Sequence, residues 1–465
     1  MTEKGFFANL SPLDHRYRAG NPALWDELSA YLSEDAYVCY QLAVEAALVE
    51  VLARRGICPA EAAQEVRKAC REVTPEEVQE EEEKTNHNIR ALVNCIQARV
   101  SEAARSFVHF TATSFDITDT ASALRYKDIT EKVVLPKLLA LEKIFIDLAR
   151  RERNTLQIGR THGQHAVPIT FGFAMAEYVD RLGGRLEKIR ESAADLRGKM
   201  AGAVGAYNAS SLFFADPGDL EHEVLAELGL KPSPYSTQIV EPEFLTDYLH
   251  ALVSCFGVLA NLADDMRNLQ RSEIAEVGEF FGATQVGSST MPHKRNPWNF
   301  EHVKSMWKEF MPRMVTVYMD QISEHQRDLT NSASARFIPE IVAGLVLTVD
   351  RLIKVAARLA VDKEAMEANF GVSREMIVAE PLYILLAYYG HPDAHEIVRV
   401  LTLEAQKTGQ SLRQLVAERE DLKPYLARMT PDQKRVLQEP ELYRGRAAEK
   451  TEELCREWEE RLGLA

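Results

Sequence analysis

The chain has 465 residues, 46% of them hydrophobic, and a formal net charge of -15 at pH 7. That hydrophobic content is enough for a large core, divided among two or three domains. The acidic balance argues against a nucleic-acid partner, which needs a basic surface. A small anionic substrate would instead need a local cluster of Arg, Lys and His in this acidic protein.

The cysteines and the apolar segments indicate the compartment. None of the six cysteines has CxxC spacing, so we interpret them as reduced thiols of a cytoplasmic protein. The opening "MTEKGFFANLSPLDHRY" lacks the apolar stretch of a signal peptide. No uncharged apolar run reaches 18 residues, so no membrane partner is expected.

Proline placement predicts long helices. Proline inside a helix costs roughly 3 kcal/mol, and none occurs within 169–216, 243–291 or 340–380. Apolar residues recur every three or four positions in long runs. The predicted long helices cover 171–200 and about 118–152, 243–281, 299–326 and 334–360, with a kink at Pro312. The predicted fold class is therefore all-α, with a long central helical bundle.

The remaining segments suggest three domains. Shorter helices are expected on both sides of the long ones, and "NFGVS", "YYGHPD" and "LKPYLARMTPDQ" break the helices near the end of the chain. We predict an N-terminal helical domain at 1–110, a central long-helix domain at 111–361 and a C-terminal helical domain at 362–465.

Two polar segments in the first quarter of the chain carry histidines. "TNHNIRAL" places His87 and Asn88 beside Arg90, which suits either a helix cap or a ligand site. "FVHFTATSFDITDTA" places His109 close to hydroxyl residues at the expected start of a helix. Such a helix start is capped by Ser, Thr or Asp, and it can also bind a carboxylate or phosphate.

The segment "GRTHGQHAVPITFG" contains His162 between Thr161 and Gly163, followed by His165. The glycines permit a tight, exposed loop that can approach a ligand closely. HxxH on a loop lacks an evident third ligand, so no metal site is predicted. A histidine that donates a proton near neutral pH fits better.

The segment "GSSTMPHKRNPWNFEH" (287–302) interrupts the long helices with two serines and a cluster of hydrogen-bond donors. Lys294 and Asn296 could stabilise negative charge that develops on an oxygen. A serine in that field could act as a base or nucleophile. A plain linker with helix caps explains the composition equally well. Glu301 is expected on the following helix.

The segment "RDLTNSASAR" places Arg327 and Arg336 on either side of a hydroxyl-rich turn that includes Ser332. Because Arg binds oxyanions with two parallel hydrogen bonds, this is a possible phosphate site. Surface ion pairs would explain both arginines as well. No Walker loop or dinucleotide fingerprint is present, so no nucleotide cofactor is implied.

In this order, "TSFDITDTA", "RTHGQHAVPITFG" and "GSSTMPHKRNP" resemble the three signature regions of the fumarase/aspartase superfamily. "SPLDHRY", "TNHNIRA", "FVHFTATS", "STQIVEPEF" and "RDLTNSASAR" are similar to its adenylosuccinate lyase branch. The resemblance implies a homotetramer with a shared helical bundle, whose active sites each draw the signature regions from three subunits. It also implies β-elimination of fumarate from an N-succinyl nucleotide, adenylosuccinate giving AMP and SAICAR giving AICAR, without metal or cofactor.

The same resemblance assigns roles to residues. Ser288 would be the base and His162 the acid, and Lys294 and Asn296 would hold the succinyl carboxylates. The residues implied to act in the chemistry are Ser288, His162, Lys294, Glu301 and His87. The residues implied to bind substrate are Arg16, Tyr17, Asn88, Arg90, His109, Thr113, Ser114, Thr161, Gln238, Ser289, Asn296, Arg327, Ser332 and Arg336. Glu301 would pair with an active-site histidine, and the arginines with Tyr17 and Ser332 would hold a phosphate.

One departure and two alternatives bear on the substrate. The branch usually has Asp where this chain has Asn88; an amide keeps hydrogen bonding but loses the charge, which affects base or ribose contacts. The first alternative is a sister lyase that releases fumarate from another succinyl substrate such as argininosuccinate, which would leave the phosphate-binding arginines without a ligand. The second is a non-catalytic structural homologue, which the presence of Ser288, Lys294 and His162 disfavours.

Overall fold

The computed structural model describes residues 5–282 and 288–464. Helices dominate the described chain, and its strands form three two-stranded sheets. The predicted all-α class is thus confirmed, with the small sheets as additions. Two compact units divide the chain: the first comprises 1–138, 184–257 and 305–350, and the second 139–183, 258–304 and 351–465.

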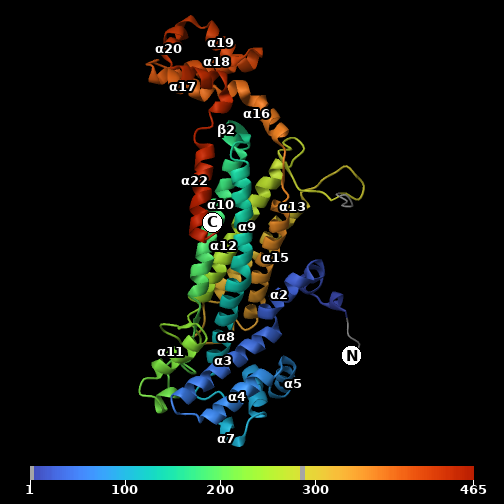
Figure 1. Cartoon of the computed structure of the whole chain (residues 1–465), viewed down its shortest axis with the longest axis vertical. Coiled ribbons are helices and arrows are strands. Elements are labelled where there is room, and N and C mark those ends of the chain that lie inside the picture. Colours follow the sequence, from blue (N-terminus) through green and yellow to red (C-terminus); the bar gives the residue numbers. More distant parts are fainter. Residues whose placement is uncertain (1–4, 283–287, 465) are drawn as a thin grey trace. The chain divides into compact units, whose positions relative to one another are not determined.

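The first unit contains a compact group of helices around α3 (Glu34–Arg54). This helix packs against α4 (Ala60–Glu72) and α8 (Ser114–Ile129) (Figure 1). Valines and leucines on α3 are fully buried, among them Val44, Leu48 and Val51. Other helices of this group are α5 (Pro75–Thr85), α6 (Asn88–Gln97), α7 (Glu102–Arg105) and α11 (Pro217–Glu227). Burial of this apolar face of α3 stabilises the group of helices against which α8 packs.

The long helices occur largely where proline spacing predicts them. They are α9 (Leu135–Arg151), α10 (Phe171–Ala194), α12 (Glu243–Leu269), α13 (Trp298–Phe310), α14 (Arg313–Met319) and α15 (Ile338–Ala356). The kink predicted at Pro312 is a full break between two helices, because α13 ends before this proline and α14 begins after it. A short π-helix, Thr130–Val134, separates α8 from α9 just before Pro136, a residue that cannot donate a backbone hydrogen bond.

Three of the predicted helices were too long. The helix predicted at 171–200 ends at Ala194. The helix predicted at 243–281 ends at Leu269, because the chain turns through Ala275 at a φ of 53° and buries the Glu276 side chain. The helix predicted at 299–326 ends at Met319, and its last residues belong to the loop that leads to Arg327.

The second unit contains the hairpin of β1 (Leu156–Thr161) and β2 (Gln164–Thr170), which packs against α16 (Lys363–Ile377). It also contains the group of α17 (Ala379–Tyr388), α18 (Ala394–Thr408) and α19 (Leu412–Glu418), coloured orange to red in Figure 1. Helix α22 (Ala447–Leu462) contacts β2. Trp458 on α22 is buried where α10 has Gly183, at which a Cβ would lie 2.5 Å from the indole.

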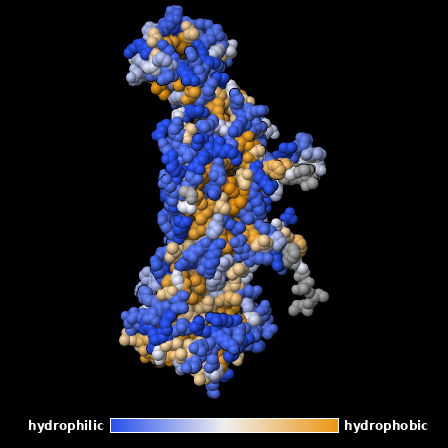
Figure 2. Space-filling model, in the orientation of Figure 1, coloured by the Kyte–Doolittle hydropathy of each residue, from blue (hydrophilic) through white to orange (hydrophobic). Residues whose placement is uncertain are grey.

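Apolar residues are distributed both in the core and at the surface. Pro22–Arg54 and Glu243–Leu269 are long and apolar enough to span a membrane by length and composition alone. Their most apolar windows are 61% and 67% buried, as expected for core helices. Figure 2 shows hydrophobic residues in orange reaching the surface between hydrophilic ones, and the exposed large side chains include Val315 and Met319 of α14.

Candidate active site

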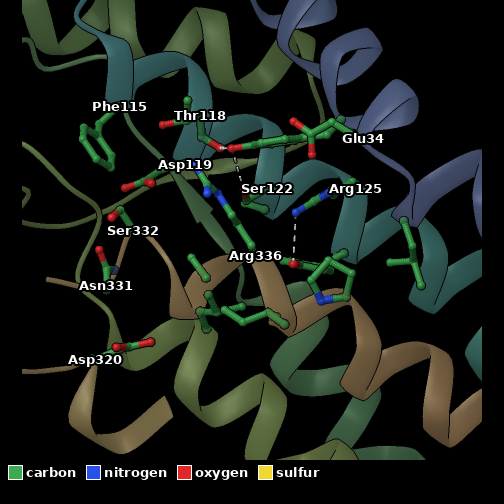
Figure 3. Close-up of a pocket in the computed structure, with 18 of the residues that line it drawn as sticks. Glu34, Phe115, Thr118, Asp119, Ser122, Arg125, Asp320, Asn331, Ser332 and Arg336 are labelled. Atoms are coloured by element: carbon green, nitrogen blue, oxygen red, sulfur yellow. Dashed lines mark hydrogen bonds between the residues drawn. The ribbon is translucent and has the colours of Figure 1, made fainter. Parts of the chain in front are cut away.

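A cavity of about 1210 Å³ lies within the first unit. It collects residues that the sequence places in three separate polar segments and in the loop before α12. The lining includes the predicted residues His87, Asn88, Ser114, Gln238, Arg327, Ser332 and Arg336. Figure 3 shows part of this lining, with Asp119 and Ser122 from α8 facing Asn331, Ser332 and Arg336.

Three buried polar atoms of the cavity residues have no hydrogen-bond partner in the described part of the chain. They are Thr118 Oγ1, Arg125 Nε and Arg327 Nε. Buried polar groups are rarely left unpaired, and such groups around one cavity are typical of a site that binds a polar ligand. Two of the three are guanidinium nitrogens, so the missing partner is expected to be an acceptor or an anion.

The two arginines of the "RDLTNSASAR" segment approach the cavity differently. Arg327 stacks on the Phe115 ring at 5.3 Å and hydrogen-bonds with Asn331. Arg336, in a short 3-10 turn (Ser334–Phe337), is exposed and extends towards Thr118 and Asp119 in Figure 3. Both cationic heads are therefore available to the same cavity, as a phosphate site requires.

Asp119 lies in the cavity wall and was not predicted as a site residue. Its carboxylate accepts a hydrogen bond from the Val240 N–H at 3.0 Å. Burial raises the pKa of Asp119 to about 6, although the Val240 N–H and the charges of Lys199 and Arg327 act to lower it. Its position in the "TSFDITDTA" motif, one helical turn after Asp116, was the signal in the sequence.

The start of α8 is held from inside the protein. Thr113 is its N-cap residue, and its N–H donates to Asp116 Oδ2 at 2.8 Å. Asp116 also pairs with Lys199 and accepts from the Ala201 N–H at 3.1 Å. The expected Thr or Ser cap at this helix is confirmed. Ser114, the first residue of α8, lines the cavity, whereas Thr113 is not among the lining residues.

His87 is the N-cap of α6, where its Nδ1 accepts from the Arg90 N–H at 3.3 Å. The capping interpretation of the "TNHNIRAL" segment is therefore confirmed for this histidine, which also lines the cavity. The Asn88 side-chain oxygen accepts from the Ile89 N–H at 2.8 Å. Asn88 reaches the cavity lining and Arg90 does not.

His109 is bound to Glu45 rather than to the cavity. Its Nδ1 lies 2.6 Å from Glu45 Oε1, and the His109 backbone N–H donates to Glu45 Oε2 at 3.1 Å. Burial lowers the pKa of His109, but the Glu45 carboxylate outweighs burial and the net shift is upward. His109 and Thr111 both have positive φ, 61° and 63°. Non-glycine residues adopt this conformation infrequently, and it often marks functional sites.

Arg16 and Tyr17 lie in a short π-helix, Leu13–Tyr17, whose residues Leu13 and Asp14 line the cavity. Neither predicted residue is itself in the lining. The Tyr17 hydroxyl donates to Met306 Sδ at 3.1 Å. The proposed phosphate contacts of these two residues are thus not assembled within this cavity.

The second unit carries the proposed acid. His162 and Gly163 form the two-residue turn between β1 and β2, with φ of 54° and 74°. Positive φ at both central residues defines the type I′ turn that suits the twist of a hairpin. The predicted tight, exposed loop is confirmed, with Thr161 at the end of β1 and both Thr161 and His162 exposed. The His165 imidazole is hydrogen-bonded within the protein, with its Nδ1 2.8 Å from Ser373 Oγ.

Both ends of strand β1 are fixed by a buried carboxylate. Glu276 is fully buried and receives two hydrogen bonds from Arg160, at 2.6 and 3.1 Å. Gln157 and Asn369 donate to the same carboxylate at 2.8 and 2.9 Å. A bidentate Arg–carboxylate pair with further donors is rigid, so it restrains the strand two residues before His162.

The segment 288–297, which carries Ser288 and Ser289, also belongs to the second unit. Gly287 lies outside the described residues. Ser288 Oγ accepts from the Met291 N–H at 3.1 Å and from the Thr290 N–H at 3.4 Å, so its lone pairs face backbone donors. Ser289 and Lys294 are exposed. Asn296 is half-buried, just before α13.

Glu301 lies in the first turn of α13, as expected, and is exposed. Glu279 secures the start of this helix by accepting from the Phe300 N–H at 2.9 Å and from Asn299 at 2.6 Å. Among the described residues, no three or more His, Cys, Asp or Glu side chains are grouped to hold a metal ion.

Comparisons with known proteins match most of the chain to lyases. The family described as "Lyase" matches residues 15–311, and the family described as "Adenylosuccinate lyase C-terminal" matches residues 323–434. The chain is 35% identical to an adenylosuccinate lyase of Archaeoglobus fulgidus over 96% of its own length and 98% of the relative's. It is 36% identical to one of Pyrococcus abyssi, with 97% and 98% covered.

The solved structures agree with the fold. A fumarate lyase from Mesorhizobium sp. BNC1 is 25% identical and superposes with a TM-score of 0.81, covering 92% of this chain and 97% of the other. Helical fold, signature segments and family matches together define a lyase of the fumarase/aspartase superfamily. Within that superfamily, this chain belongs to the adenylosuccinate lyase family.

Proposed function

We propose that this chain catalyses the β-elimination of fumarate from adenylosuccinate, which gives AMP, and from SAICAR, which gives AICAR. The observation that carries the proposal is the cavity whose lining includes Arg327, Ser332 and Arg336 together with Gln238 and Ser114. Two arginines around a hydroxyl-rich turn suit a phosphate, and the nucleotide substrate of this family supplies one. Argininosuccinate carries no phosphate for these arginines.

The elimination needs a base, an acid and groups that stabilise a developing dianion. Ser288 is the proposed base, which takes a proton from the carbon next to a carboxylate. The electrons then form the double bond of fumarate as the carbon–nitrogen bond breaks. His162 is the proposed acid, which protonates the departing nitrogen. Neither step requires a metal or an organic cofactor.

The aci-carboxylate that forms carries additional negative charge. Lys294 and Asn296, with Ser289, are proposed to hold the succinyl carboxylates, together with Thr113 and Ser114 at the start of α8. The backbone N–H groups of Thr290 and Met291 donate hydrogen bonds to Ser288 Oγ. Such donors stabilise the deprotonated hydroxyl, which supports the proposal that Ser288 acts as the base. Glu301 is proposed to pair with an active-site histidine and to support its protonated form.

The nucleotide part would occupy the cavity of the first unit. Arg327, Arg336 and Ser332 are proposed to bind the phosphate there, and Arg16 and Tyr17, which lie outside the cavity lining, are proposed as further phosphate contacts. His87, Asn88 and Gln238 are proposed to contact the purine, ribose and succinyl parts of the substrate from the cavity lining. Arg90, His109 and Thr161, which lie outside that lining, are proposed as further contacts. Asn88, in place of the usual Asp of this family, keeps hydrogen bonds to the substrate but removes a charge.

We further propose a cytoplasmic homotetramer whose active sites combine the signature regions of three subunits, and a division into domains at 1–110, 111–361 and 362–465. The exposed apolar residues of α14, such as Val315 and Met319, support burial of this helix between subunits.

The test is fumarate release, followed by absorbance, from adenylosuccinate, SAICAR and argininosuccinate supplied separately to purified protein. We expect turnover of the two nucleotides and none of argininosuccinate. Release from argininosuccinate alone would replace the proposed substrate with a sister substrate. No release from any of the three would contradict a catalytic role.

A further inference from the structure

The segment 236–240, which carries Gln238, runs along the cavity without regular secondary structure. On one side it abuts Gly205, where an added Cβ would lie 2.0 Å from the Ser236 oxygen and 2.7 Å from the Thr237 oxygen. Within the segment, the Thr237 N–H donates to the Ile239 oxygen at 3.0 Å. The segment is therefore confined against Gly205, and its other contacts decide where Gln238 points.

The contact on the α8 side is Asp119. The Val240 N–H, two residues after Gln238, donates to Asp119 Oδ2 at 3.0 Å. Asp119 itself is held on a helix whose first turn is fixed by the buried Asp116–Lys199 pair. The segment thus lies between a glycine that leaves no space and a carboxylate on a rigid helix.

A carboxylate is an unexpected neighbour for a site that binds anions, because it repels them. The charge of Arg327 lowers the pKa of Asp119, and Arg336 extends towards it in Figure 3. These cations offset its charge, and its partly buried position in the cavity wall distinguishes it from a solvated surface group. A structural link to the Gln238 segment accounts for both its place in the cavity wall and its hydrogen bond from the Val240 N–H.

We propose that Asp119 is a positioning residue for substrate: its hydrogen bond to Val240 holds the segment 236–240 so that Gln238 faces the bound nucleotide. This inference rests on the proposed function, and it adds a residue that acts through Gln238 rather than by touching substrate. Asp119 governs substrate binding more than the chemical step, because Ser288 and His162 lie on other elements.

The experiment compares Asp119→Ala with Asp119→Asn, both assayed for KM and kcat with adenylosuccinate and for thermal unfolding. Ala removes the acceptor, whereas Asn retains an oxygen that can accept from Val240. We expect Asp119→Ala to raise KM about tenfold, as loss of a hydrogen bond to a charged group predicts, with kcat within about threefold of wild type. Asp119→Asn should restore KM to within about threefold.

Asp128→Ala is the matched control, because Asp128 is on the same helix, accepts a hydrogen bond from the Tyr40 hydroxyl at 2.9 Å and does not line the cavity. Its KM should be unchanged. A double-mutant cycle tests the route of the effect: in a Gln238→Ala background, Asp119→Ala should raise KM no further. Additive effects in the cycle would overturn the proposal.

Two other outcomes would also overturn it. The first is a normal KM for Asp119→Ala, and the second is an Asp119→Asn variant as impaired as Asp119→Ala. A purely structural role would lower the unfolding temperature and kcat of Asp119→Ala without a selective change in KM. If wild-type protein releases no fumarate from adenylosuccinate, the proposed function fails before the variants are compared, so the two failures are distinguishable.

Discussion

Lys199 and Asp116 form an ion pair in which both side chains are fully buried. The Asp116 carboxylate also accepts from the N–H groups of Thr113, Ala201 and Gly202. The carboxylate is thus surrounded by donors in a water-free environment, where removal of one partner leaves an uncompensated charge. This pair connects the start of α8 to the segment that follows α10.

Lys199→Met should therefore destabilise the protein by about 3–5 kcal/mol, the cost of leaving a buried carboxylate without its cation. The double variant Lys199→Met/Asp116→Asn should recover part of that loss, because no isolated charge remains. Denaturant unfolding of the wild type, both single variants and the double variant measures the coupling. A double variant as unstable as the sum of the singles would contradict this account.

Ser288→Ala should lower kcat by about 10²–10⁴ if Ser288 is the base, since positioned proton transfer contributes about that factor. The measurement is fumarate release at saturating adenylosuccinate. Ser289→Ala is the neighbouring control, because it removes a hydroxyl from the same loop but leaves the base, and its kcat should fall much less. A near-normal kcat for Ser288→Ala would show that the base assignment is wrong.

His162→Gln should be similarly inactive, and the two inactive proteins test the shared site. If each site takes Ser288 and His162 from different subunits, mixed tetramers contain some sites with both residues intact. Partial activity should therefore return after subunit exchange between Ser288→Ala and His162→Gln proteins. Exchange verified by differently tagged subunits, with no recovery of activity, would argue against sites shared among subunits.

Glu142 on α9 is fully buried, and neither carboxylate oxygen has a hydrogen-bond partner among the described residues. Burial, together with the charge of Asp180, raises the pKa of Glu142 from 4.5 to about 9. The folded state then keeps a proton that the unfolded state releases, so the free energy of unfolding falls as pH rises from about 4.5 to about 9.

Glu142→Gln removes this titration, so the variant should gain stability over wild type by roughly 1.4 kcal/mol for each pH unit across that window. Unfolding at several pH values measures the difference. Glu449→Gln, at an exposed position of α22, is the control and should show no such trend. A difference between Glu142→Gln and wild type that does not change with pH would exclude a raised pKa.

Gly205 and Gly202 provide a matched pair for the cavity wall. Both have left-handed φ, 75° and 79°, but a Cβ at Gly202 would meet nothing within 4 Å. Gly202→Ala should cost about 1–2 kcal/mol from backbone strain alone. Gly205→Ala should cost more and should also raise KM, since its methyl group displaces the Ser236–Gln238 segment. Equal thermal unfolding of the two variants would show that the contact with Ser236 is not tight.

The sequence predicted features that local chemistry determines. Proline spacing located the long helices and the break at Pro312, and the glycines located the tight turn at His162. The strands around His162 were missed, because Gly159 and Pro168 weaken any strand pattern. The turn after α12, which buries Glu276, was missed because the partner of Glu276, Arg160, is distant in sequence. The role of Asp116 was missed for the same reason, since its partner is Lys199.

The cavity and the histidine turn belong to different parts of the chain. Residues that would recognise a nucleotide, such as Arg327 and Gln238, lie in the first unit, whereas Ser288 and His162 lie in the second. Substitutions that enlarge, shrink or recharge the cavity can therefore alter which succinylated compound is accepted while the elimination chemistry is inherited unchanged. Such a separation makes the scaffold suitable for laboratory evolution towards new leaving groups.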